Sequence, residues 1–469
     1  MRAAAFFDLD RTLLRGASGP VLSQALRDTG VISSRALPGE GAVYRLFDLI
    51  GETRPSMMLA RQAARAAKGW SQDEVRQAGE LAADQLTAAV QPFAHGLVAE
   101  HRASGRLVVL ATTTPDDMIR ALADRLGFDD VVATRYGVDG DGRYDGTIDG
   151  EFTWGRGKLQ AVRDWAAIHE VELANSWAYS DSFYDAPLLG AVGHPIVVNP
   201  DPRMIGLAIL RRWPIVHLDV PEGVPKLPLL GIEPQKLLMQ LIRPELTPWV
   251  RLDISGVEHI PESGPAILVS NHRSYFDPLA LGFAFAKRGR PVRFLGKREV
   301  FDAPMVGQAV RAMGGIRVDR EGGAEESLVE ATKALAAGEL VAILPQGTIP
   351  RGLAFFEPEL EGRWGAARLA ALAHVPIVPF GLWGTEAVWP RSERFPRVWN
   401  VLHPPTVSVT GGPPVELKHK SPKADTRRIM TAITDLLPPE AREPHDPTPD
   451  ELAHSYPPGW KAEEAKSGG

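Results

Sequence analysis

Residues 3–12 read AAAFFDLDRT, an apolar run that ends in two aspartates separated by one residue. A short apolar run bounded by polar residues is typical of a buried strand. Similar runs alternate with helix-like segments up to about residue 200, which predicts a Rossmann-like α/β fold with a parallel sheet covered by helices. We expect its strands at 3–7, 107–111, 131–133, 176–179 and 195–198.

The chain is expected to form two domains, because 469 residues exceed what one compact core usually holds. The first α/β domain is predicted to cover residues 1–201. Between its first two strands, about residues 18–100, apolar residues recur at mixed helical spacings. This insertion therefore predicts a helical cap on the first domain.

A second α/β pattern covers residues 251–438, after a proline-rich stretch at 202–250 that predicts a connector. Residues 439–469 are rich in Pro, Glu, Lys and Gly, so we expect a flexible, solvated tail. The strands of the second domain are expected at 266–270, 292–295, 341–344 and 377–380.

Composition excludes several classes of function. The balance of 52 Lys+Arg against 58 Asp+Glu gives a net charge of −6 and no electrostatic case for a nucleic-acid partner. The absence of cysteine excludes disulfides, thiolate nucleophiles and cysteine zinc sites. The N-terminal apolar run is too short for a signal peptide, and we find no apolar run of about 18 residues that predicts a spanning helix.

Asp8 and Asp10 directly follow the first expected strand, where open α/β sheets bind their ligands. One carboxylate can attack phosphorus to form an aspartyl-phosphate, while its neighbour protonates the leaving oxygen and then activates water. Because two close carboxylates repel each other, a divalent cation with oxygen ligands, Mg²⁺, is the expected cofactor. The alternative for an isolated pair is a solvated turn.

Later residues fit the same site if their strands are neighbours. Thr112 ends an apolar run and can hydrogen-bond a phosphate oxygen, and Lys158 can place a positive charge beside the aspartyl-phosphate. Asp181 and Asp185 follow another apolar run, so Asp181 can ligate the metal and Asp185 can support Lys158. For Lys158 alone, a surface position is the alternative.

The order of these motifs resembles the haloacid dehalogenase superfamily, and the helical insertion resembles its phosphoserine-phosphatase-like branch. The resemblance covers residues 1 to about 201. It implies Asp8 as nucleophile, Asp10 as acid and base, and Mg²⁺ held by Asp8, Asp181 and the backbone carbonyl of Asp10. The motifs are DLDRT at 8–12, Thr112, Lys158, SDSFYD at 180–185 and VVNPD at 197–201.

A second candidate site lies in NHRSYFDP, residues 271–278, again directly after an apolar run. His272 and Asp277 would be about 140° apart on a regular helix, so their contact requires a loop. Asp277 and Pro278 supply one, because Asp favours the N-cap and Pro the first helical position. The carboxylate can then orient the imidazole to deprotonate an alcohol that attacks a thioester. The alternative is that Asp277 only caps a helix.

Two later motifs fit a phosphate-bearing acceptor. Arg317 and Arg320 can grip a phosphate if both face the cleft, although a surface role is the alternative for Arg317. The residues Gln346, Gly347 and Thr348 follow an apolar run, and the glycine allows a ligand to approach the backbone closely.

Together these motifs resemble the lysophospholipid and glycerol-phosphate acyltransferase family over about residues 255–385. The resemblance implies His272 as general base, Asp277 as its orienting partner, Arg320 as the binder of the acceptor's phosphate, and Gly347 and Thr348 in the acceptor pocket. It implies transfer of an acyl chain from acyl-CoA or acyl carrier protein to 1-acylglycerol-3-phosphate, giving phosphatidate.

Two positions depart from this family. Its members usually carry Glu where this chain has Gln346, and Arg where it has Ile349. Arg351 can replace the latter from a shifted position. The identity of the acceptor is therefore less well predicted than the type of reaction.

A lysophospholipid substrate requires contact with a bilayer, and we expect a peripheral location at the inner, cytoplasmic face of the membrane. The connector mixes bulky apolar residues with cations, as interfacial segments do. A short helix packed on the acyltransferase core is the alternative. The residues concerned are KLLMQLIR at 236–243, Leu227, Leu229, Leu230, Arg211, Arg212 and Trp213.

Two other functions remain open. One is a phosphatase for phosphoserine or another small metabolite with a degenerate C-terminal domain, and the other is a scaffold that only senses a ligand. Intact His272 and Asp277 argue against the first. The complete set of Asp8, Asp10, Lys158 and Asp181 argues against the second.

Overall fold

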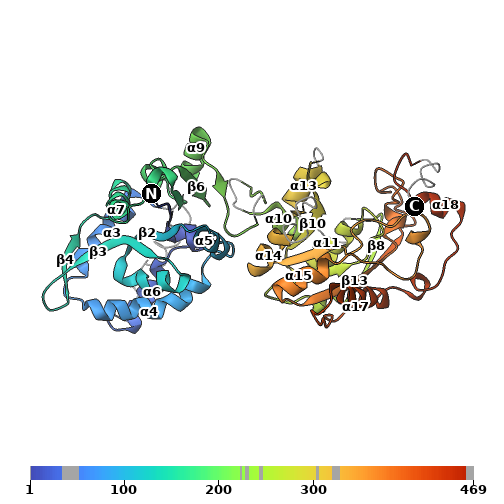
Figure 1. Ribbon diagram of the computed structural model, residues 1–469, viewed down its shortest axis with the longest axis horizontal. Coiled ribbons are helices and arrows are strands. Elements are labelled where there is room, and N and C mark those ends of the chain that lie inside the picture. Colours follow the sequence, from blue (N-terminus) through green and yellow to red (C-terminus); the bar gives the residue numbers. More distant parts are fainter. Residues whose placement is uncertain are drawn as a thin grey trace. The chain divides into compact units, whose positions relative to one another are not determined.

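The computed structural model describes residues 2–33, 52–221, 224–227, 232–241, 247–302, 306–318 and 328–460. It contains two compact units, Met1–Glu222 and Gly223–Gly469. Each unit has its own seven-stranded sheet with helices against it (Figure 1). The predicted fold class, two α/β domains with mostly parallel sheets, is confirmed.

The sheet of the first unit has the order β4-β3-β2-β1-β5-β6-β7 and is parallel except for β4. Its central strand β1 is buried on both faces: Ala5 and Phe7 enter one core cluster, and Ala4 and Phe6 enter the other. The strands are β1 (Ala4–Phe7), β2 (Leu107–Pro115), β3 (Asp130–Val138), β4 (Tyr144–Asp149), β5 (Trp177–Ser180), β6 (His194–Val198) and β7 (Ile215–Val216).

The insertion between β1 and β2 is mainly helical over its described part, as predicted. Helix α4 of this insertion lies against α6, which follows β2. The helices of the unit are η1 (Leu9–Leu13), α1 (Gly19–Asp28), α3 (Arg54–Ala66), α4 (Gln72–Ala88), α5 (Ala94–Ala103), α6 (Asp116–Leu126), α7 (Arg156–Ile168), η2 (Leu173–Asn175), η3 (Phe183–Asp185), α8 (Ala186–Leu189) and α9 (Pro202–Arg211).

The sheet of the second unit has the order β11-β10-β12-β9-β13-β14-β8, with β14 antiparallel to β13. Its strand β9 is again buried on both faces, because Ala266 and Leu268 enter one core cluster while Ile267 and Val269 enter another. The strands are β8 (Arg251–Ser255), β9 (Ala266–Ser270), β10 (Val292–Lys297), β11 (Ile316–Val318), β12 (Leu340–Ile343), β13 (Ile377–Trp383) and β14 (Thr406–Gly411).

The helices of the second unit cover both faces of this core. Within the described ranges, no helix is long and apolar enough to cross a membrane. The helices are α10 (Pro234–Leu241), η5 (Val257–His259), α11 (Asp277–Arg288), α12 (Arg298–Asp302), α13 (Val306–Ala312), α14 (Val329–Ala336), η7 (Gly352–Phe355), α15 (Gly365–Ala373), α16 (Thr385–Val388), α17 (Pro422–Asp435), η8 (Pro439–Ala441) and α18 (Pro449–His454).

The structure differs from the expected connector and tail. Helix α9 and strand β7 belong to the first unit, because Asp201 caps α9 and β7 pairs with β6 at the sheet edge. Residues 439–460 are not a purely solvated tail, since Ser455 Oγ accepts a 2.9 Å hydrogen bond from the N–H of Gly352. Leu229, Leu230, Arg243 and residues 461–469 lie outside the described residues.

A buried ionic cluster attaches α10 to the second unit. The guanidinium of Arg293 on β10 is fully buried, 2.7 Å from Glu233 and 3.3 Å from Glu339. Gln235 donates to the carbonyl of Val292. The segment that leads into α10 therefore helps to neutralise the buried charge of Arg293. This contact supports the second interpretation of residues 236–243, a short helix packed on the acyltransferase core.

We expect Glu233→Ala to destabilise the second unit by about 3 kcal/mol, because it leaves the buried Arg293 cation incompletely paired. Lys236→Ala is the matched control: Lys236 contacts the same carboxylate at 2.8 Å but is half exposed, and its loss should cost less than about 1 kcal/mol. Native-state hydrogen exchange of β10 peptides would measure both. Equal effects would contradict the assigned role of the cluster.

Candidate active sites

The first candidate site begins where β1 ends. Asp8 follows Phe7 and donates its N–H to the carbonyl of Tyr179 on the neighbouring strand β5. The chain then turns through η1, where Arg11 has a φ of 59°. This left-handed conformation is uncommon for residues other than glycine and tends to mark functional loops.

Lys158 connects two carboxylates in this site. Its Nζ lies 2.8 Å from Asp8 and 2.7 Å from Asp185, and its side chain is 1% exposed. Ser180 also donates to Asp185, at 2.7 Å. Although burial acts to lower it, the two carboxylates raise the pKa of Lys158, so the lysine stays charged. The predicted neighbourhood of Asp8, Lys158 and Asp185 is present.

Asp181, which follows β5, contacts the η1 turn that follows β1. Its Oδ1 accepts a 3.2 Å hydrogen bond from Thr12, and its Oδ2 lies 3.4 Å from Arg11. Asp10 Oδ1 accepts a 2.5 Å hydrogen bond from the N–H of Ser18, so this oxygen holds the entry to α1. Polar groups of residues 11–18 thus fix the positions of both Asp181 and Asp10.

Thr112 lies in β2, close to the level at which the neighbouring strand β1 ends. It lies two residues after Leu110, which pairs with Phe7 across β1 and β2. Its buried Oγ1 accepts a 3.2 Å hydrogen bond from the N–H of Thr114. Strand β2 therefore places Thr112 just beyond the level of Phe7, where the chain turns from β1 into η1.

Glu52 is a member of the site that the sequence analysis missed. It precedes α3 in the helical insertion, and its Oε2 accepts hydrogen bonds from Ser182 at 2.6 Å and Trp154 at 3.0 Å. Burial and the nearby Asp185 raise its pKa. These partners are more than 100 positions away in sequence, so no local signal marks this residue.

The acids of this site carry more negative charge than the chain's own cations offset. Burial raises the pKa of Asp8 from 3.8 to about 7, against the opposing effect of Lys158. Burial and repulsion from Asp8 raise the pKa of Asp181 well above its usual range. A cation between them would relieve this repulsion.

The oxygen donors fit Mg²⁺ on these grounds, since hard cations prefer carboxylate and carbonyl ligands. Within the described part of the chain, no three acidic or histidine side chains are arranged as a metal cluster. A metal here would therefore be held by Asp8 and Asp181 together with a backbone oxygen, for which the resemblance suggests Asp10.

The second candidate site begins where β9 ends. Asn271 exchanges two hydrogen bonds with the backbone of Leu382, at 2.9 and 2.8 Å, and fastens the loop to β13. His272 Nδ1 then lies 2.7 Å from Asp277 Oδ2, at the first residue of α11. The carboxylate of Asp277 is fully buried. The predicted turn is present, but Asp277 is the first residue of α11 and not its N-cap, which is Phe276 without a side-chain cap hydrogen bond.

The other contacts of Asp277 hold this turn closed. Its Oδ2 also accepts the N–H groups of Arg273 at 2.6 Å and Ser274 at 2.9 Å. Because a carboxylate on Nδ1 favours the tautomer with a proton there, Nε2 keeps its lone pair. His272 is thus arranged as a base at the cavity described next.

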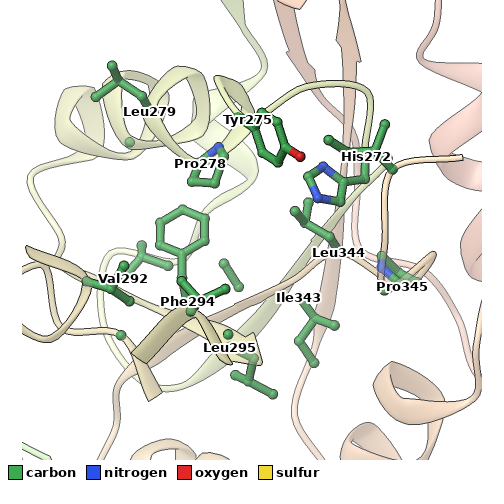
Figure 2. Close-up of a pocket in the computed structure, with 18 of the residues that line it drawn as sticks. His272, Tyr275, Pro278, Leu279, Val292, Phe294, Leu295, Ile343, Leu344 and Pro345 are labelled. Atoms are coloured by element: carbon green, nitrogen blue, oxygen red, sulfur yellow. The ribbon is translucent and has the colours of Figure 1, made fainter. Parts of the chain in front are cut away.

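A cavity of about 1610 Å³ opens beside His272. It is larger than the roughly 300–1,000 Å³ of ordinary small-ligand pockets. Figure 2 shows the imidazole of His272 and the ring of Tyr275 above apolar side chains from the sheet. Its apolar lining includes Leu279, Phe285, Val292, Phe294, Leu295, Ile343 and Leu344.

Gln346 supports the histidine loop. Its Oε1 accepts a 2.6 Å hydrogen bond from the N–H of His272. A glutamate would accept the same hydrogen bond. Gln346 therefore keeps the hydrogen-bond acceptor that most acyltransferases have at this position, but without its negative charge. Gly347, at a φ of 71°, and Thr348 line the cavity directly afterwards.

Of the two predicted phosphate-binding arginines, only Arg317 lies in the described part of the chain. Arg317 lies on the edge strand β11, where its side chain is 42% exposed and lies 3.4 Å from Asp302. It does not line the cavity in the described structure, and Arg320 lies outside the described residues. Arg351 stacks 5.2 Å from the ring of Trp460. The expectation that Arg317 faces the cleft is therefore wrong in this structure.

Arg391 is a buried cation of the cavity that the sequence analysis missed. It follows β13 and α16, lines the cavity and is 7% exposed. Its Nη1 donates to the carbonyls of Ile349 and Pro350. It therefore adjoins the position where acyltransferases usually carry their own arginine, although it comes from a distant segment.

Comparisons with known proteins agree with the two sites. A model of haloacid dehalogenase-like hydrolases matches residues 5–190, and a model of acyltransferases matches residues 251–383. The inhibition of morphological differentiation protein of Streptomyces azureus is 33% identical over 244 residues, which cover 51% of this chain and 87% of that protein.

Two relatives from Mycobacterium tuberculosis are named as phosphatases. A probable phosphatase is 35% identical over 48% of this chain and 78% of its own length. A phosphoserine phosphatase is 32% identical over 49% of this chain and 77% of its own length.

Among solved structures, the 1-acyl-sn-glycerophosphate acyltransferase of Thermotoga maritima has a TM-score of 0.32 and 22% identity, over 43% of this chain and 78% of that one. From the matched models and relatives, the chain belongs to the haloacid dehalogenase-like hydrolases through its N-terminal unit and carries an acyltransferase-family domain in its C-terminal unit.

Proposed function

We propose that the second unit transfers an acyl chain from acyl-CoA or acyl carrier protein to 1-acylglycerol-3-phosphate, giving phosphatidate. The observation that carries this proposal is the 2.7 Å contact between His272 and Asp277 at a large apolar cavity. The apolar walls suit a fatty chain, and the histidine is the base that an acceptor hydroxyl needs.

In this reaction Nε2 of His272 takes the proton of the acceptor hydroxyl as its oxygen bonds to the thioester carbonyl carbon. The carbon–sulfur bond then breaks, and the imidazolium returns the proton to the leaving thiolate. Asp277 stabilises the imidazolium charge and fixes the ring. Protons and bonds balance over the cycle.

Arg391 is our candidate for binding the acceptor's phosphate. A buried cation without a carboxylate partner is costly, and an incoming anion relieves that cost. No carboxylate of the described residues forms an ion pair with Arg391, and its Nε has no hydrogen-bond partner there. Arg317, by contrast, is already paired with Asp302.

For the first unit we propose Mg²⁺-dependent hydrolysis of a phosphomonoester through an aspartyl-phosphate. Asp8 attacks phosphorus, Asp10 protonates the leaving oxygen and then activates water, and Lys158 stabilises the charge on the transferred group. Mg²⁺, when bound, would neutralise charge on the phosphate. The substrate is a phosphorylated metabolite or lipid; the phosphoserine phosphatase among the relatives favours a phosphoserine-type substrate as the second candidate.

The two activities are expected to be separable. Asp8→Asn should abolish Mg²⁺-dependent phosphate release and leave acylation of 1-acylglycerol-3-phosphate unchanged, because it removes only the phosphorus nucleophile. His272→Ala should lower acylation by about 10²-fold or more, the scale of a lost general base, and leave phosphate release unchanged. Assays of both activities on both folded variants provide the check. Loss of both activities in either variant would refute their independence.

Replacement of Arg391 should affect acceptor binding. We expect Arg391→Lys to raise KM for 1-acylglycerol-3-phosphate by about tenfold, because a lysine loses the forked contacts of the guanidinium. It should change KM for an acceptor without a phosphate much less. Arg317→Lys is the matched control, and steady-state kinetics with both acceptors would measure the effects. Equal effects of the two substitutions, or equal effects on the two acceptors, would contradict this role.

Mg²⁺ binding should depend on pH. The folded pKa of Asp8, about 7, exceeds its unfolded value of 3.8, so the metal-free unit loses stability as the pH rises through this window. Below pH 7, Mg²⁺ must displace a proton from Asp8, so the affinity for Mg²⁺ should fall roughly tenfold for each pH unit. Lys158, Asp181, Asp185, Glu52 and Arg11 are the charged groups around this acid.

Calorimetric titration with Mg²⁺ at pH 6 and pH 8 would test this dependence. We expect affinity at least tenfold weaker at pH 6, and little binding by Asp8→Asn at either pH. Asp141→Asn, in an exposed turn, is the control and should behave as the wild type. An affinity that does not change with pH would contradict the assigned linkage.

A further inference from the structure

The segment between α16 and β14 exposes an unusual run of bulky apolar side chains. Phe395, Trp399 and Leu402 are 73%, 71% and 86% exposed, and Val398 and Val401 are also exposed. Single exposed apolar residues are ordinary, but a contiguous group marks an interaction surface. We call residues 391–402 the apolar loop.

The base of the apolar loop is fastened to the folded unit. Arg397 donates its backbone N–H to the carbonyl of Val388 and forms a 2.5 Å ion pair with Glu393. Trp389 donates its indole N–H to the carbonyl of Glu393 at 3.0 Å. The unit thus holds the base of the loop while its apolar side chains stay in solvent.

The apolar loop continues directly from the wall of the cavity. Arg391, Glu393 and Arg394 belong to both. Four further cavity residues are themselves exposed apolar side chains, so the rim of the cavity and the loop have the same character. These four are Tyr275, Leu279, Val300 and Trp364.

We propose that the apolar loop is a bilayer-docking surface that brings the mouth of the acyl cavity to a leaflet with anionic headgroups. This rests on the proposed acyltransferase function, because its acceptor and product reside in a bilayer. Tryptophan and phenylalanine favour the membrane interface, and the loop places the exposed Arg394 beside them for anionic headgroups, whereas Arg397 is paired with Glu393.

The other candidate segments are less suited to this role. Helix α10, which the sequence suggested, contributes Met239 to the cavity wall and is attached through Glu233 to the buried Arg293. Helix α9 exposes Ile209 and Leu210, at 69% and 78%, but it belongs to the first unit. This exposed pair offers a matched control for the loop.

The test is flotation of the full chain with vesicles of phosphatidylcholine alone or mixed with phosphatidylglycerol. The double variant Trp399→Ser/Leu402→Ser should partition at least about tenfold more weakly onto the mixed vesicles, as expected from the apolar surface removed. Ile209→Ser/Leu210→Ser should partition as the wild type does, and the wild type should prefer the anionic vesicles.

Three outcomes would overturn the proposal: a wild-type chain that does not float, equal loss in both double variants, or unchanged flotation of the loop variant. A loop variant that floats normally but loses a concentration-dependent dimer in sedimentation would assign the surface to a second protein copy instead. Unchanged circular dichroism and melting temperature of the variants would show that they fold.

A kinetic arm separates this proposal from the proposed function. With a short-chain acceptor below its micelle concentration, the loop variant should acylate at the wild-type rate. With the acceptor embedded in vesicles, its rate should fall about tenfold. If no chain acylates either acceptor, the acyltransferase proposal fails, while flotation still decides whether the loop docks. If both rates fall equally, the docking role is overturned.

Discussion

A carboxylate removed from water must be matched by donors, and this requirement shapes both sites. In the second unit, the buried Asp277 gathers two backbone N–H groups and the ring of His272 on one oxygen. In the first unit, Asp185 gathers Lys158 and Ser180. Asp277 thus holds His272 directly where β9 ends, whereas Asp185 holds Lys158 of α7, which in turn contacts Asp8 where β1 ends.

The two sites differ in what surrounds these acids. The first is rich in charge: Asp8, Asp181 and Glu52 all have raised pKa values, and the local cations do not offset them. Such a site favours a metal ion and the transfer of a charged group. The second opens into an apolar cavity in which Arg391 is a buried cation, which suits a fatty chain that carries one phosphate.

The ionic cluster around the buried Arg293 fixes a segment that helps to form the cavity of the second unit. Because Arg293 is fully buried, the segment around Glu233 is attached to β10, and Met239 of α10 then contributes to the cavity wall. A segment that the sequence presents as a connector is thus part of the chamber. Among the described residues of this unit, the apolar surface that we propose for membrane docking lies elsewhere, on the loop that carries Trp399.

The sequence by itself determined the central strands, the order of the motifs and the contact between His272 and Asp277. These depend on runs and turns of fewer than ten residues, in which burial and proline act locally. The short or half-exposed strands β4, β7, β8, β11 and β14 were missed, because such strands leave a weaker apolar pattern.

Tertiary structure alone decided the places of Glu52, Arg293 and Arg391. Glu52 meets Ser182 across 130 positions, Arg293 meets Glu233 across 60, and Arg391 meets Ile349 across 42. From the sequence alone, charged residues such as these are predicted to lie at the surface. Only the packing of distant segments removes them from water and selects their partners, and it leaves Arg317 at an exposed edge.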